Sequence, residues 1–233
     1  MNSSQKVSHI ELSKGLLRVL QKAKKTNYNF FITGDESWFY LSTNPETQWL
    51  PPEEKPSRRV KKTIDSENDM LSIFWNPHRF FLVKLLPSGL KFNRTYFINE
   101  ILEPLHEMMN DLSEEPERKI ILHYDNAKPH TSRKVFEYLE SHNMGKAPQL
   151  PFSPDIAPSD FYLFGYVKDQ LKGRSFRSPD ELLLAVNVIL EEISPDTLIR
   201  VFQDWEERLI QMIEHNGESF AFLQRFAFVN MKC

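Results

Sequence analysis

Residues 120–130, IILHYDNAKPH, place an apolar run directly before an aspartate, an asparagine and, five residues after the aspartate, a histidine. Such an apolar run, rich in isoleucine, is typical of a buried strand. Aspartate is also a common turn residue after a strand. Asp125 therefore has two interpretations, a turn residue or a carboxylate of a functional site, and only partners elsewhere in the chain can support the second.

Two further aspartates are candidate partners. Asp35 follows a predicted strand over 28–33, and Asp160 stands at the start of a predicted helix over 159–173. Carboxylates about 4 Å apart repel by about 4 kcal/mol at an effective dielectric of about 20, and a shared proton or a bound cation relieves this. Oxygen-only ligands suit Mg²⁺ or Mn²⁺. Two such ions about 3.5–4 Å apart can support an in-line phosphoryl displacement.

The composition is that of a globular protein. The 233 residues are 40% hydrophobic and 26% charged, which is enough to bury a core. No apolar stretch is long enough to cross a bilayer and the N-terminal residues lack a signal-peptide core, so we expect neither a membrane partner nor secretion. The single cysteine, Cys233, excludes an intrachain disulfide and a cysteine-ligated zinc site. Cytoplasm and nucleus both fit.

The order of predicted elements indicates one mixed α/β domain. Gly34 is expected to end the first strand, with 37–42 returning as its hairpin partner and Trp38 in the core. Asn93 is a plausible helix cap. The other expected strands are 70–75, 79–87 and 119–124, and the expected helices are 10–25, 93–112, 132–142, 159–173 and most of 179–223.

Three sequence blocks resemble, in order, the signature blocks of mariner-family DNA transposases: TGDESWFY (33–40), HYDNAKPH (123–130) and SPDIAPSDFYLF (153–164). The catalytic carboxylates of that family match Asp35, Asp125 and Asp160. The 34 residues between the last two are the spacing that marks the mariner branch. The similarity covers about residues 30 to 220.

This resemblance implies a ribonuclease-H-like fold, a mixed sheet flanked by helices. Residues 28–223 would form the catalytic domain, preceded by a helical lead-in or linker over 1–27 and followed by a tail over 224–233. Residues 44–69 would be an inserted clamp-like loop that reaches DNA or a partner subunit. That loop carries KPSRRVKK (55–62), with five basic residues in eight.

The function implied by the resemblance is cut-and-paste transposition. The three aspartates would hold two Mg²⁺ or Mn²⁺ ions, water would cleave DNA at transposon ends, and the freed 3′-hydroxyl would attack target DNA at a TA step. The implied partners are DNA and a second copy in the full-length protein, and the implied location is the nucleus. The alternatives are a transposon-derived DNA-binding or interaction module that no longer transposes, and a ribonuclease-H-type hydrolase.

Several residues near the carboxylates keep two interpretations each. Asn126 would orient a ligand or simply form a turn, and His130 would contact DNA or cap the next helix. We expect Glu36 on the opposite strand face from Asp35, in a salt bridge or at the surface. His123 is expected in the core. The residues expected to contact DNA are Arg58, Arg59, Lys61, Lys62, Asn126, Lys128 and His130.

Overall fold

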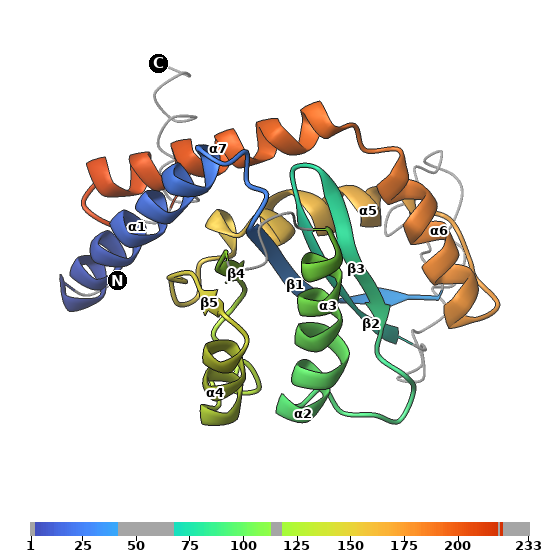
Figure 1. Cartoon of the computed structure of the whole chain (residues 1–233). Helices are drawn as coiled ribbons and strands as arrows, with labels where there is room; N and C mark the ends of the chain where they lie inside the picture. The colour runs from blue at the N-terminus through green and yellow to red at the C-terminus, as the bar shows by residue number, and fades with distance from the viewer. Residues whose placement is uncertain (1–2, 42–67, 113–117, 219, 221–233) are drawn as a thin grey trace, which may run out of the picture.

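A five-stranded mixed sheet forms the centre of the protein (Figure 1). The computed structural model describes residues 3–41, 68–112, 118–218 and 220. The strand order is β3-β2-β1-β4-β5, with β1 antiparallel to β2 and parallel to β4. The strands are β1 (Phe31–Tyr40), β2 (Asn68–Asn76), β3 (Arg79–Leu85), β4 (Ile120–His123) and β5 (Met144–Lys146). The predicted α/β class, a mixed sheet flanked by helices, is confirmed.

Helices cover both faces of the sheet (Figure 1). Asn93 begins the helical segment that runs through α2 and α3, and its Oδ1 accepts hydrogen bonds from the backbone N–H groups of Thr95 and Tyr96, which confirms the predicted cap. The α-helices are α1 (Ser3–Lys24), α2 (Arg94–Tyr96), α3 (Glu103–Leu112), α4 (Arg133–Ser141), α5 (Phe164–Gln170), α6 (Pro179–Glu191) and α7 (Pro195–Glu214), joined by the π-helical turns η1 (Phe97–Leu102) and η3 (Ser159–Leu163) and the 3₁₀ turn η2 (Pro154–Ile156).

Two hydrophobic cores lie on opposite faces of the sheet. The first packs α1, α5, α6 and α7 against one face, with Phe31 of β1 against Phe202 and Trp205 of α7. The second packs the α2–α3 segment and α4 against the other face, with Phe74 of β2 against Phe97. Successive residues of a strand point to opposite faces, so neighbouring side chains on β1 enter different cores.

The expected hairpin at Gly34 is wrong, because β1 runs without interruption from Phe31 to Tyr40. Gly34 lies opposite Phe74 in the pairing with β2, and a Cβ on Gly34 would stand 2.2 Å from the Phe74 ring. The glycine therefore permits a close approach inside one strand and does not end it. The expectation that Trp38 packs in the core is also wrong, since its side chain is 46% exposed.

The N-terminal helix is part of the main core. Leu16 and Leu20 of α1 are fully buried, and α1 packs along α7. The predicted division at residue 27 into a lead-in and a domain therefore does not separate two hydrophobic cores. The predicted clamp-like loop 44–69 lies outside the described residues except for its last two, which form the start of β2. The predicted tail 224–233 also lies outside them.

Strand β5 was not predicted. It has only three residues, and its pairing with β4 stabilises it. Among the described helices, none is long and apolar enough to cross a membrane.

The close approach at Gly34 gives a stability prediction. Gly34→Ala should lower the free energy of unfolding by about 1–3 kcal/mol, because the added Cβ meets the fully buried Phe74 ring. A thermal unfolding curve should show a midpoint lower by about 2–4 °C for each kcal/mol lost.

Gly165→Ala is the matched control. A Cβ at Gly165 meets nothing within 4 Å, and alanine favours a helix over glycine, so this variant should be as stable as the parent or more stable. Equal midpoints for both alanine variants would contradict the argument.

Candidate active site

The three predicted carboxylates come from three elements that meet beside β1. Strand β1 pairs with β4 so that Thr33 lies opposite His123. Asp35 and Asp125 each follow this pair by two residues and therefore lie level, just beyond the C-terminal end of β4. Asp35 is inside β1 and not at a strand end, but the parallel register still brings the two together as expected.

Asp160 joins them from η3, which packs against β1. Asp35 has the strand parity of Phe31, so its side chain points to the face covered by α5 and α7, and it is hydrogen-bonded to Asp160. Asp35 also accepts a hydrogen bond from the backbone N–H of Glu36, at 2.8 Å. The sequence therefore predicted the three members of this cluster correctly as neighbours.

The electrostatics of the cluster are those of crowded carboxylates. Burial raises the pKa of Asp35 to about 8, and the charges of Asp160 and Asp125 add to the rise. Burial and the charge of Asp125 likewise raise the pKa of Asp160, against the lowering effect of Lys168. Burial and the neighbouring carboxylates therefore act in the same direction on Asp35 and Asp160 and favour the protonated form of each more than in water.

Asp125 behaves differently because it is surrounded by donors. Burial alone would raise its pKa, but hydrogen bonds from His130 and from the Ala127 backbone, with the charge of Lys146, lower it below the usual value. The His130 Nδ1 stands 2.5 Å from the Asp125 Oδ1, and the Ala127 N–H stands 3.0 Å from the same oxygen. Asp125 is thus both a turn residue and the ionised member of the cluster.

A cation that prefers oxygen ligands fits this set of carboxylates. A divalent ion would offset the repulsion that raises the pKa of Asp35, and Mg²⁺ or Mn²⁺ typically takes one or two carboxylates and completes its shell with water or phosphate oxygens. Within the described ranges, no three His, Cys, Asp or Glu side chains are arranged to hold one ion together. The fit therefore rests on the oxygen-only chemistry of the neighbouring carboxylates.

His130 is buried, which corrects the DNA contact expected for it. Its side chain is 1% exposed and lies among the rings of Phe92, Phe97 and Tyr124. On one side it binds Asp125, and on the other its Nε2 lies 3.4 Å from the Glu36 Oε2. The histidine therefore has no surface to offer DNA and instead fixes the position of the Asp125 side chain.

Glu36 is largely buried, so the expected surface position is wrong, and the contact with His130 is the charged pairing given as the other alternative. It does face away from Asp35, as predicted, but its side chain is only 11% exposed. Burial raises its pKa well above the usual value, and the charges of Asp35 and Asp125 add to this. The strand pattern gave the direction of Glu36 correctly, but it could not show that the α2–α3 segment covers that face.

Two lysines beside the cluster were missed by sequence reasoning. The Lys146 Nζ donates to the Asp125 carbonyl at 2.7 Å and to the Asn126 Oδ1 at 2.9 Å, and burial lowers the Lys146 pKa to about 8. No sequence signal marked Lys146, because β5 itself was not recognised. Lys168 lies two helical turns after Asp160, so helical spacing could have found it; its Nζ donates to the Ser37 Oγ at 2.7 Å.

The other predicted residues divide into three groups. Asn126 is exposed, and its amide donates to the Gln149 carbonyl at 3.1 Å, which fits a turn residue that ties two loops. Lys128 is exposed and lines a hollow beside α2. His123 is buried as expected, with its Nδ1 3.0 Å from the Thr33 Oγ1. Arg58, Arg59, Lys61 and Lys62 lie outside the described residues.

Comparisons with known proteins find similarity to a transposase family and to two curated proteins. A family model described as transposase (partial DDE domain) matches residues 39–121, a range that contains none of the three aspartates. The Mariner Mos1 transposase of Drosophila mauritiana is 27% identical over 158 residues, which are 66% of this chain and 46% of that protein. Human histone-lysine N-methyltransferase SETMAR is 24% identical over 222 residues, 94% of this chain and 32% of that protein. The chain thus spans less than half the length of either relative.

Solved structures show the same fold. The crystal structure of the catalytic domain of Mos1 mariner transposase matches with a TM-score of 0.73 at 22% identity, covering 94% of this chain and 96% of that one. A pre-cleavage Mos1 transpososome matches with a TM-score of 0.80 at 21% identity, covering 94% and 64%. The ribonuclease-H-like fold expected from the sequence is confirmed by this likeness.

The raised pKa of Asp35 predicts a pH-dependent stability when divalent metal is removed. The folded-state pKa lies above the unfolded value, so the stability that the protonated carboxyl contributes is lost as the pH rises toward about 8. Asp35→Asn stays neutral, so with EDTA present its stability relative to the parent should grow by at least about 1 kcal/mol between about pH 5 and about pH 8.

Asp125→Asn is the control, because the pKa of Asp125 is lowered and an amide there should give no such growth. Thermal unfolding at the two pH values measures both differences. A relative stability of Asp35→Asn that is the same at both values would refute the assigned charge states.

Proposed function

Because the chain is a homologue of the mariner transposases and has the fold of their catalytic domain, we propose that it cuts and joins DNA strands with Asp35, Asp125 and Asp160. The observation that carries the proposal is the convergence of these carboxylates, from β1, the loop after β4 and η3, in one cluster where their charges act on one another. Cut-and-paste transposition is the activity that this cluster supports best.

The proposed cofactors are two Mg²⁺ or Mn²⁺ ions. Mos1 structures are described with Mn and with Mg, which supports a divalent ion in the relative. When bound, such ions activate an attacking oxygen and stabilise a leaving oxygen in an in-line displacement. Asp35, Asp125 and Asp160 would hold these ions, because oxygen-only ligands suit these metals.

Other residues of the chain would orient the aspartates and supply positive charge beside them. His130 and the Ala127 N–H hold the Asp125 carboxylate in one orientation and keep it ionised. Lys146 fixes the loop that carries Asp125 by binding its carbonyl. Lys168 supplies positive charge near Asp160. In hydrolysis the water oxygen bonds to phosphorus while the P–O3′ bond breaks, which frees a 3′-hydroxyl. In joining, the oxygen of that hydroxyl loses its proton and bonds to a phosphorus of the target strand, while the P–O3′ bond at that phosphorus breaks and its 3′ oxygen leaves as a hydroxyl.

The proposed partners follow the relatives. Mos1 is described in paired-end complexes with a transposon end and in a strand transfer complex. We propose transposon-end DNA and a TA target as substrates, a homodimer for the longer protein, and the nucleus as the location. A binding module that has lost catalysis is less favoured, because all three carboxylates are present and meet in one cluster.

The proposed chemistry predicts metal-dependent nicking of plasmid DNA. The purified chain with Mn²⁺ or Mg²⁺ should convert supercoiled plasmid to the nicked form, and EDTA should stop it. Asp125→Ala should slow nicking by at least about 100-fold, since a lost metal ligand removes about 3 kcal/mol or more of transition-state stabilisation.

Asp111→Ala is the matched control, because Asp111 is an exposed carboxylate at the end of α3 and lies outside the cluster. It should nick at the parent rate. A folded parent chain that nicks no DNA with either metal, or an Asp125→Ala variant as active as the parent, would argue against the proposal.

A further inference from the structure

An open hollow lies between the start of α2 and the loop that carries Asp125. Its volume is about 390 Å³. Four consecutive residues before and within α2 form one wall, and the loop ahead of α4 forms the other, as Figure 1 shows for the neighbouring lower ends of these helices. The lining residues are Phe92, Asn93, Arg94, Thr95, Lys128, Pro129 and Ser132.

The hollow is positively charged. Arg94 and Lys128 stand on its opposite walls and both are exposed. Among the described residues, neither side chain has a carboxylate partner, and the lining includes no Asp or Glu. Two uncompensated cations from separate segments, beside the hydroxyls of Thr95 and Ser132, suit an anion with several oxygen acceptors.

The helix ends are not the source of this preference. The first N–H groups of α2 are already bonded to Asn93. The Ser132 side chain, in contrast, makes no cap to α4, and its hydroxyl has no hydrogen-bond partner. The argument therefore rests on the two cationic side chains and the shape of the hollow.

The hollow is physically joined to the carboxylate cluster. Lys128 is three residues after Asp125 in the same loop. Phe92 from the other wall packs edge-on against the His130 ring, with the centroids 5.5 Å apart, and His130 holds Asp125. An anion in the hollow and a phosphodiester at the cluster would thus be held by one continuous set of contacts.

We propose that this hollow binds a phosphodiester of the DNA strand whose reacting linkage lies at Asp35, Asp125 and Asp160, with Arg94 and Lys128 as the contacts. The inference rests on the proposed function and adds to it a second point of attachment. Two contacts on one strand would fix its direction across the cluster, which a single reacting phosphate cannot do.

Duplex binding without catalysis tests the site. Fluorescence anisotropy with a labelled duplex of about 30 base pairs, in EDTA, gives the affinity as a function of salt. Arg94→Gln/Lys128→Gln should weaken binding about tenfold or more at about 0.1 M salt and lower the slope of log K against log salt by about 2. Each single variant should lower the slope by about 1.

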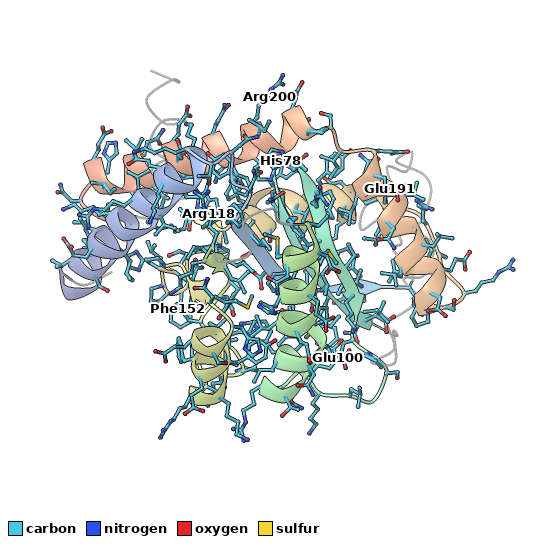
Figure 2. The ribbon with its side chains drawn as sticks, viewed as in Figure 1. His78, Glu100, Arg118, Phe152, Glu191 and Arg200 are labelled. Carbon is cyan, nitrogen blue, oxygen red and sulfur yellow. The ribbon has the colours of Figure 1, made fainter. Side chains whose placement is uncertain are left out.

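Lys25→Gln/Arg200→Gln is the matched control, with the same loss of charge at two exposed residues that do not line the hollow. Figure 2 shows Arg200 on α7, at the end of the molecule opposite α2 and α4. This variant should bind like the parent. Inorganic phosphate as a competitor distinguishes a site for a DNA phosphodiester from a site for free phosphate. The proposal requires that inorganic phosphate displace DNA poorly.

The outcomes separate the two proposals. Equal weakening of DNA binding by both double variants would mean a general charge effect and would overturn the proposed site. The site would also be overturned if neither double variant weakened binding or if the parent bound no duplex. Efficient displacement of DNA by inorganic phosphate would overturn it as well. None of these results depends on nicking, which tests the proposed catalytic function by itself. Unfolding curves of the variants confirm that exposed residues were changed without loss of fold.

Discussion

The parallel pairing of β1 with β4 is the interaction on which the rest of the site depends. It sets Thr33 opposite His123, and a buried hydrogen bond of 3.0 Å joins their side chains. Burial lowers the pKa of His123 to about 3, so the ring stays neutral and suits its buried position against Trp205. A shift of one residue in the register of β1 against β4 would turn the Asp35 side chain to the opposite face of the sheet and separate it from Asp125 and Asp160.

The two faces of β1 then take different parts in one arrangement. Asp35 points toward Asp160 and the core that contains α7, whereas Glu36 points into the core beneath the α2–α3 segment. His130 links the cluster to Glu36, since it contacts both Asp125 and Glu36. The position of the Asp125 carboxylate therefore depends on the packing of His130 against Phe97 and Tyr124.

Sequence patterns predicted the fold class, most helices and the proximity of the three aspartates, because apolar periodicity and the ordered blocks are local signals. They failed where distant residues decide the outcome. Gly34 was expected to end a strand, since nothing in the local sequence reveals the Phe74 ring beside it. His130 was expected at the DNA, since its burial comes from Phe92 and Phe97 in another segment. Lys146 could not be recognised, because its three-residue strand exists only through its pairing with β4.

The contact between Gly34 and Phe74 has a consequence for how such a chain can change over generations. The ring occupies the space that any side chain at position 34 would need, and position 34 directly precedes Asp35 in β1. A larger residue at position 34 becomes acceptable only when position 74 becomes smaller, and a small residue at position 74 next to glycine leaves a void. The two positions therefore form an epistatic pair, and each restricts the mutations open to the other.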